Sequence, residues 1–373
     1  MIICDVYDTS RAQRDSEADL DEERLINRSA PPESNSDFLV IKLIGRIVIS
    51  VVKQCWALSG AMFITICVFY WIFGGISAFI LLCFSAAGIF YRAGDKMLYY
   101  PEIPQNSRIF VQAPNTINLP FENLYIKSLD STKLHAYFLP QPQPLQCPTI
   151  LFFHGNAGNI GHRLPNIKGL YKNLKANLLI VEYRGYGLSE GNPSESGLYK
   201  DAQAALNYLF TRQDVDHTRI FVFGRSLGGS VAIDLASRAC NIDKIACLIV
   251  ENSFTSIPDM AFQILPWKGL KYIPLWLNKN KFLSKKKVTS VRCPTIFVSG
   301  LSDQLVPPTM MLDLYTHCGS ERKLLLQIPN GDHNGTWTKP GYYAQLERSI
   351  QDVCSDRLLH QEQIMTLLSV QTV

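Results

Sequence analysis

The sequence has no CxxC pair, although its 373 residues include ten cysteines at irregular spacings. This absence argues against a cysteine-ligated zinc site and against a small disulfide scaffold. The sequence also lacks a strong charge of either sign, because the formal net charge is only +4. Nucleic-acid-binding domains typically carry a concentrated basic face, so we expect no nucleic-acid partner. No internal repeat is visible.

Charge is completely absent from residues 54–91, between Lys53 and Arg92. About 20 apolar residues span a bilayer, so this stretch has room for one transmembrane helix with an interfacial approach. Apolar residues are densest over 70–91, where we place that helix. It begins too deep in the chain for a cleaved signal peptide. A hairpin that turns at Gly74-Gly75, with two short arms, and a buried core helix remain alternatives.

Basic residues flank the predicted transmembrane helix unequally. Lys42, Arg46 and Lys53 precede it, whereas Arg92 and Lys96 follow it. Because cytoplasmic flanks carry the excess of Lys and Arg, the pattern favours a single-pass type II arrangement. The C-terminal domain would then be luminal or extracellular.

Short apolar runs alternate with helical segments after residue 100. This alternation predicts an α/β fold with a mainly parallel sheet flanked by helices. The first two runs have no helix between them and are expected to add antiparallel edge strands. The eight runs cover residues 124–127, 134–138, 149–153, 178–182, 220–223, 246–250, 295–298 and 324–328.

A G-x-S-x-G motif centred on Ser226 follows the run 220–223 directly, and residues 230–238 then have a helical pattern. This strand–turn–helix context is the one that a nucleophile elbow requires. The glycines give room for a strained turn that exposes the serine hydroxyl. The motif is short enough to occur by chance, so the prediction depends on finding a base, an acid and oxyanion donors.

Two backbone N–H groups are candidates for the oxyanion hole. One belongs to Leu227, the residue after the nucleophile, and the other to Asn156 in the loop 154–159. This loop of small residues follows the run 149–153 directly. A simple tight turn is the alternative. His154 precedes the nucleophile and is expected to orient the loop rather than to act as the base.

Asp303 is the candidate acid, because it follows the run 295–298 beyond the nucleophile. Glu251, directly after the run 246–250, is the rival. Asp332 is adjacent to the candidate base, and sequence neighbours rarely face each other well enough to orient a ring.

His333 is the candidate general base. Of the seven histidines, it alone lies in the loop after the run 324–328. Four precede Ser226, His317 lies in a predicted helix, and His360 lies near the C-terminus. The chain order serine, aspartate, histidine is that of the α/β-hydrolase elbow enzymes.

These motifs resemble the α/β-hydrolase superfamily over about residues 97–355, and more narrowly its membrane-anchored members, whose relatives include acyl-protein thioesterases. The resemblance implies a charge-relay system of Ser226, Asp303 and His333, a signal-anchor helix and a catalytic domain on the non-cytoplasmic side. The acidic N-terminus departs from the family pattern.

The expected function is a membrane-anchored serine hydrolase that cleaves acyl esters or thioesters, with lipids or palmitoyl-proteins as candidate substrates. Neither a metal nor an organic cofactor is expected. An apolar segment with a lysine run, 254–291, is expected to form a cap that suits an acyl chain or a membrane surface. A packed cap with a solvated lysine face is the alternative. A catalytically inactive binding or scaffold protein and a transferase with the same elbow also remain open.

The predicted organisation has five parts. They are a disordered acidic tail (1–37), a membrane-proximal segment (38–69), a transmembrane helix (70–91), a hydrolase domain (97–355) and a C-terminal tail (356–373). Glycosylation sequons occur at Asn27 and Asn334, on opposite sides of the predicted helix, so both cannot be used.

Overall fold

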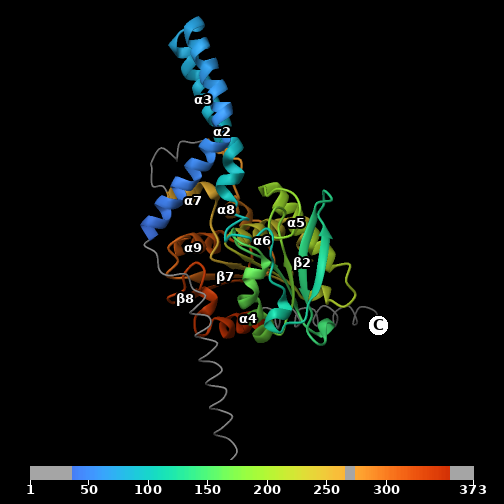
Figure 1. Cartoon of the computed structure of the whole chain (residues 1–373). Helices are drawn as coiled ribbons and strands as arrows, with labels where there is room; N and C mark the ends of the chain where they lie inside the picture. Colours follow the sequence, from blue (N-terminus) through green and yellow to red (C-terminus); the bar gives the residue numbers. More distant parts are fainter. Residues whose placement is uncertain (1–35, 265–273, 353–373) are drawn as a thin grey trace, which may run out of the picture. The chain divides into compact units, whose positions relative to one another are not determined.

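The computed structural model describes residues 36–264 and 274–352 (Figure 1). The chain divides into two compact units, with the boundary between Leu82 and Cys83. The predicted acidic tail lies outside the described residues except for its last two positions, which begin a helix. The predicted C-terminal tail, the sequon at Asn27 and residues 265–273 of the predicted cap also lie outside them.

Two helices meet at a single glycine near the start of the described chain. Helix α2 covers Ser36–Phe73 and helix α3 covers Gly75–Leu98. Gly74 between them has a φ of +83°, a left-handed conformation that glycine adopts without steric cost. The bounds predicted for one continuous helix, 70–91, are therefore wrong. The break falls where the sequence left a hairpin open as the alternative.

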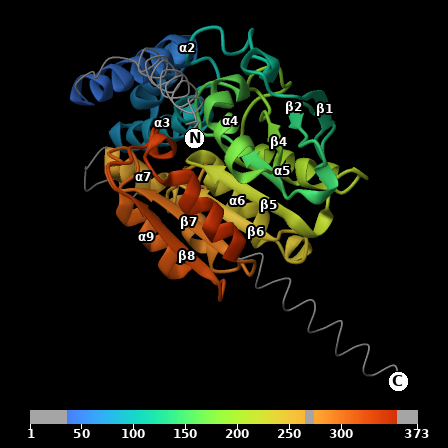
Figure 2. The same ribbon diagram turned by 90° about the horizontal axis from the view of Figure 1, so that it is seen from below.

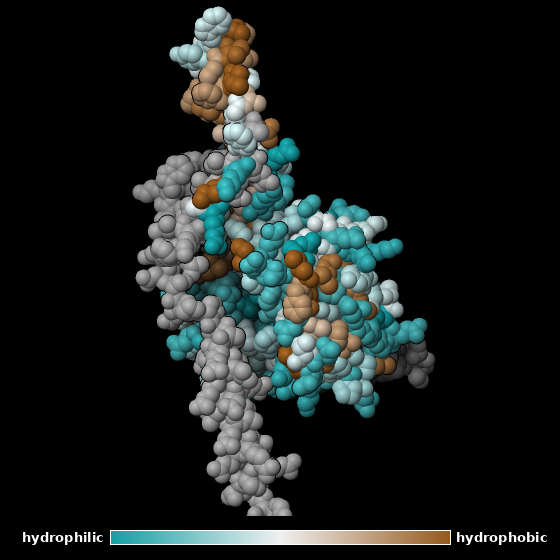
Figure 3. Space-filling model, in the orientation of Figure 1, coloured by the Kyte–Doolittle hydropathy of each residue, from teal (hydrophilic) through white to brown (hydrophobic). Residues whose placement is uncertain are grey.

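Helix α3 is the one helix among the described residues that is long and apolar enough to cross a membrane. Large apolar side chains near the break are exposed, with Trp71 89% and Ile76 80% accessible. Figure 3 shows apolar residues gathered on α2 and α3 around the break. Apolar surface that contacts no protein is typical of segments that contact lipid or a partner.

The second unit is built on one eight-stranded sheet with the order β1-β2-β4-β3-β5-β6-β7-β8. Strands β1 and β2 are antiparallel at one edge, and the pairs from β4–β3 through β7–β8 are parallel. The predicted fold class and the two antiparallel edge strands are thus confirmed. The strands are β1 (Glu122–Lys127), β2 (Lys133–Leu139), β3 (Thr149–Phe153), β4 (Asn177–Val181), β5 (Ile220–Arg225), β6 (Cys247–Glu251), β7 (Thr295–Gly300) and β8 (Lys323–Ile328).

Both faces of the central sheet are covered by helices, which explains why strands β3–β7 are buried at every position and mostly apolar without alternation. In β3, Leu151 and Phe153 join the core cluster formed with α5, α6, α8 and α9, whereas Ile150 and Phe152 join the opposite cluster with α4. A helix from residue 342 covers the second face too, opposite α9 in Figure 2. The helices are α4 (Leu164–Leu174), α5 (Glu195–Leu209), α6 (Leu227–Ser237), α7 (Ile257–Ile264), α8 (Ser284–Val288) and α9 (Pro308–His317).

Candidate active site

The predicted site residues meet at the carboxyl ends of the parallel strands. Ser226 follows β5, Asp303 lies in the loop after β7, and His333 lies in the loop after β8. The loop that begins at His154 follows β3, which pairs with β5. Parallel strands end at one edge of the sheet, so residues that are far apart in the sequence converge there.

Ser226 occupies a strained turn between β5 and α6. Its φ of 54° and ψ of −119° are rare for a residue with a side chain. A side chain at Gly228 would collide with the backbone of Phe153, and one at Gly224 would collide with the carbonyl of Gly228. The backbone N–H of Ser226 donates to the carbonyl of Glu251 over 2.9 Å. The neighbouring strand thus fixes the turn, and the glycines make room for it.

Two hydrogen bonds connect Ser226, His333 and Asp303 in a chain. The Nε2 of His333 lies 3.0 Å from the Oγ of Ser226, and its Nδ1 lies 2.7 Å from Oδ2 of Asp303. Because a carboxylate can only accept, the Nδ1 carries the proton and Nε2 can accept the serine proton. This arrangement can activate a serine as a nucleophile.

Asp303 is held by the backbone of its own loop. Its Oδ1 accepts the N–H groups of Leu305 and Val306 over 2.9 and 2.8 Å. Its side chain is only 2% exposed, against 12% for His333. The oxygen that faces His333 is therefore fixed in direction, which orients the imidazole ring.

Glu251 and Asp332, the other two acids considered, face elsewhere. Glu251 is fully buried, lies 3.4 Å from the Nε of Arg225, and accepts the hydroxyl proton of Tyr342. Burial raises the pKa of Glu251, and the nearby Arg225 opposes that rise. Asp332 accepts the N–H groups of Asn334 and Gly335 and so caps its own turn. Asp303 is thus the carboxylate that the geometry gives to His333.

Hydrogen bonds from Arg225 hold the loop that carries His333. The guanidinium of Arg225 donates to the carbonyl of His333 over 2.8 Å and to the Oδ1 of Asn334 over 3.0 Å. No role for Arg225 is predicted from the sequence. The feature that could have indicated a role is its position in the motif, between Gly224 and Ser226.

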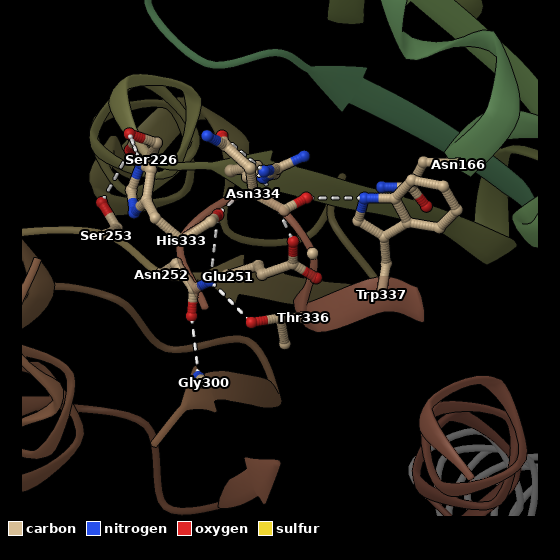
Figure 4. Close-up of polar contacts among 12 residues, drawn as sticks. Asn166, Ser226, Glu251, Asn252, Ser253, Gly300, His333, Asn334, Thr336 and Trp337 are labelled. Atoms are coloured by element: carbon tan, nitrogen blue, oxygen red, sulfur yellow. Dashed lines mark hydrogen bonds and ion pairs between the residues drawn. The ribbon is translucent and has the colours of Figure 1, made fainter. Parts of the chain in front are cut away.

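Asn252 joins the histidine loop to the strand that precedes the acid. Its Oδ1 accepts the N–H of Gly300 over 2.8 Å, and its Nδ2 donates to Thr336 Oγ1 over 2.9 Å (Figure 4). The same Nδ2 lies 3.3 Å from the carbonyl of His333. Sequence reasoning missed this residue as well, although the polar run Glu251-Asn252-Ser253 directly after a buried strand was a signal for a site.

Both oxyanion candidates belong to segments that adjoin the serine. Leu227 is the first residue of α6, and the N–H groups of a first helical turn have no acceptor within the helix. A side-chain carbon at Gly155 would lie 3.5 Å from the Cβ of Ser226, so the loop with Asn156 packs against the nucleophile. Two N–H donors near a serine hydroxyl can stabilise an oxyanion.

His154 is buried at the start of this loop, and its two ring nitrogens face groups other than Ser226. Its Nδ1 lies 2.7 Å from the carbonyl oxygen of Gly155, and its Nε2 lies 3.0 Å from Oε1 of Glu182. The other oxygen of Glu182 accepts the N–H of Ile160 over 2.9 Å. Through these contacts His154 can support the loop. The expectation from its position before the nucleophile is likewise that it orients the loop rather than acts as the base.

The lysine run of the predicted cap is largely paired with acids of its own unit. Lys279 pairs with Asp95, Lys285 pairs with Asp313, and Lys287 pairs with Asp234. Paired lysines attract an anionic head group less strongly than free ones do. This favours the alternative of a cap packed on the core over a lysine surface for anionic lipid.

Asn334 lies at the rim of the site. It is exposed, and Thr336 of the same sequon is fully buried. Across the described ranges, 36–264 and 274–352, no three His, Cys, Asp or Glu side chains form a group that could hold a metal ion.

Comparison with known proteins places these features in a family. The family model for the alpha/beta hydrolase fold matches residues 148–280. The alpha/beta hydrolase domain-containing protein WAV2 of Arabidopsis thaliana is 40% identical over 66% of this chain and 83% of its own length. The uncharacterized membrane protein YNL320W of Saccharomyces cerevisiae is 34% identical, over 72% of this chain and 92% of its own. The solved esterase Pf2001 of Pyrococcus furiosus has a TM-score of 0.53 at 18% identity, over 65% of this chain and 96% of its own, a likeness of fold.

Proposed function

Because the chain belongs to the α/β-hydrolase family, we propose that it is a serine hydrolase that cleaves acyl esters or thioesters. The observation that carries this proposal is the hydrogen-bonded chain from Ser226 through His333 to Asp303. The fold shared with an esterase of Pyrococcus furiosus supports the same class of reaction.

In the first half of the reaction, the Nε2 of His333 accepts the proton of Ser226 as Oγ attacks the acyl carbonyl. The N–H groups of Leu227 and Asn156 stabilise the negative charge on the carbonyl oxygen. Asp303 stabilises the imidazolium and keeps the proton on Nδ1. His333 then protonates the departing alcohol or thiol, and the acyl group stays on Ser226.

In the second half, a water molecule replaces the leaving group. His333 accepts its proton as the water oxygen attacks the acyl-enzyme carbonyl, and the same two N–H groups stabilise the second tetrahedral intermediate. Collapse of that intermediate releases the carboxylic acid and returns the proton to Ser226. Apart from the substrate and this water molecule, the proposed steps use only groups of the chain itself.

Membrane anchoring by α3 is part of the proposal. Its length and apolar composition suit a transmembrane helix, and a relative at 34% identity has the name of a membrane protein. The basic residues Lys42, Arg46 and Lys53, which precede the charge-free stretch 54–91, favour a type II orientation with a luminal or extracellular catalytic unit. We place lipid or palmitoyl-protein acyl groups first among the substrates, because the anchor would hold the site beside them.

Labelling with a fluorophosphonate probe tests the nucleophile directly, because the probe reacts only with an activated serine. We expect the full chain in detergent to be labelled and Ser226→Ala to be unlabelled and inactive. The control Ser237→Ala, at the far end of α6, should match wild type. No labelling of the wild type, with no ester hydrolysis by either the wild type or Ser226→Ala, would indicate a catalytically inactive scaffold. Release of acylated products with a competing alcohol would indicate a transferase.

Two further measurements test the substrate and the orientation. Among p-nitrophenyl esters, kcat/KM should rise with acyl length, and a flat profile would remove the basis for lipid substrates. Glycosidase treatment should shift the wild-type band but not that of Asn334→Gln, since that residue is exposed and would lie on the luminal side. An unshifted wild-type band argues against glycosylation at Asn334.

A further inference from the structure

The C-terminal end of α3 belongs to the catalytic unit and contacts the oxyanion loop. From Cys83 onward, α3 lies in the same compact unit as the sheet. The Nδ2 of Asn156 donates to the carbonyl of Leu98 over 2.6 Å. Two residues further on, Tyr100 forms a parallel β-bridge with Ala157. The last turn of the proposed membrane helix thus continues directly into contact with the loop that packs against Ser226.

Tyr186 closes this contact from the other side. Its hydroxyl donates to the Oδ1 of Asn156 over 2.8 Å. The ring is fully buried, and burial raises the pKa of Tyr186 well above its ordinary value. The hydroxyl therefore stays neutral and keeps its proton. Both polar ends of the Asn156 side chain are fixed, one by the helix end and one through Tyr186.

The same helix end is also attached to the cap segment. Asp95 pairs with Lys279 and accepts the Nδ2 of Asn280 over 2.8 Å. Tyr99 is buried, and its hydroxyl donates to the Oδ1 of Asn280 over 2.9 Å. A movement of the last turn of α3 would therefore displace the cap segment and the oxyanion loop together.

The distance along the helix sets how near the bilayer this loop lies. The charge-free stretch ends at Tyr91, and Leu98 is seven residues further along the same helix. At a rise of 1.5 Å per residue, Leu98 lies roughly 10 Å beyond the apolar boundary. An acyl chain that is partly withdrawn from the bilayer can cover that distance.

We propose that Asp95, Leu98, Tyr99 and Tyr100, at the end of α3 and just after it, are a positioning element for the oxyanion loop, so that acylation of Ser226 depends on α3 being seated in a bilayer. This proposal rests on the serine hydrolase function above. It also specifies the substrate class as esters or thioesters whose acyl chains lie in the membrane that holds α3. Asn156 and Leu227 would stabilise the oxyanion fully only when the helix end holds the loop in place.

Tyr186→Phe tests the positioning role. The variant keeps the buried ring and removes the hydrogen bond of the hydroxyl to Asn156. For p-nitrophenyl butyrate and the full chain in phosphatidylcholine vesicles, we expect kcat to fall about tenfold, as a misplaced oxyanion donor predicts. KM and the pH profile should not change, because the ring of Tyr186 stays in place and the hydrogen bonds of His333 are kept. The control Tyr171→Phe, which loses one hydroxyl bond to Pro140 over 2.8 Å at the sheet edge, should keep its kcat within twofold.

The dependence on the bilayer is tested with the same water-soluble ester, so that partitioning of the substrate into vesicles or micelles does not affect the measured kcat. Wild type should have a kcat several-fold higher in vesicles than in detergent. Asp95→Asn, which loses the pairing with Lys279, should lose most of that difference. The neighbouring control Lys96→Gln, an exposed position, should retain it.

The outcomes separate the two proposals. If Ser226→Ala still hydrolyses the ester, the hydrolase function itself is wrong. If Ser226→Ala is inactive but Tyr186→Phe matches Tyr171→Phe, the positioning role alone is wrong. Equal kcat values in vesicles and detergent for wild type would overturn the dependence on the bilayer.

Discussion

The buried pair of Arg225 and Glu251 beneath the histidine loop predicts a stability change that depends on pH. Their side chains are 7% and 0% exposed, and the Nε of Arg225 lies 3.4 Å from Oε1 of Glu251. That oxygen has no hydrogen bond among the described residues. The positive charge of Arg225 is therefore the main interaction that offsets the cost of burying its negative charge. The replacement Arg225→Met keeps most of the alkyl stem and removes the charge and its donors.

The expected loss is large because Glu251 would remain buried without its cation. Removal of one partner of a buried ion pair typically destabilises a protein by about 3–5 kcal/mol. In a domain of this size each kcal/mol lowers Tm by about 2–4 °C, so Arg225→Met should melt roughly 6–20 °C below wild type near neutral pH.

The sign of the pH dependence follows from the carboxyl group. Burial raises the pKa of Glu251 and Arg225 opposes the rise, so the variant should have a higher pKa than wild type. A carboxyl whose folded pKa is raised contributes its full stability below the unfolded pKa, about 4.3, and loses it as pH rises through the folded pKa. The deficit of Arg225→Met should therefore be small near pH 4.5 and grow towards pH 8.

The double variant Arg225→Met/Glu251→Gln separates stability from activity. Without a buried charge it should recover most of the lost Tm, and its deficit should be independent of pH. Its kcat should stay low, because the bonds of Arg225 to His333 and Asn334 are still missing. Thermal melts of the full chain in detergent at pH 5 and 8 measure the change in Tm, and an ester hydrolysis assay measures kcat. A double variant as unstable as Arg225→Met, or an equal deficit at both pH values, would refute the reasoning.

Three shorter predictions concern the site itself. Asp303→Asn should keep the fold and lower kcat by about 10⁴-fold, since an amide can hold the wrong imidazole tautomer; the control Asp332→Asn should stay within tenfold in the same ester assay. Gly228→Ala should abolish fluorophosphonate labelling, because its methyl group would collide with the backbone of Phe153; labelling at the wild-type rate would contradict that packing. Dialysis against EDTA should leave ester hydrolysis unchanged, and a loss reversed by added metal would contradict a metal-free mechanism.

The sequence predicts the sheet well, for a physical reason. Strands buried on both faces need continuous apolar runs, and runs such as 149–153 coincide with the strand that forms, Thr149–Phe153. The order of Ser226, Asp303 and His333 is also readable, because each follows its own strand and parallel strands end at one edge. Local chemistry and topology suffice for both.

Other features depend on partners that the sequence does not place. Arg225 contacts His333 across 108 positions, and Lys279 pairs with Asp95 across 184. No local sequence pattern indicates such pairs. From the sequence alone, the lysines of segment 254–291 could therefore not be distinguished from a free basic face. The break at Gly74 lies within a uniformly apolar stretch whose composition suits a helix throughout. The helix ends there because Gly74 adopts a φ of +83°.

The end of β6 shows why a strand without a proposed catalytic residue still controls the site. In the sheet it lies between β5, which carries the nucleophile, and β7, which leads to the acid. The carbonyl of Glu251 accepts the N–H of Ser226, and Asn252 contacts both Gly300 and the histidine loop. Ser253 Oγ donates to the carbonyl of Ser226 over 2.9 Å. Three consecutive residues thus fix the relative positions of three catalytic segments. Because such segments must be held to within about 0.5 Å, substitution of Asn252 should lower kcat although its side chain touches none of the reacting atoms.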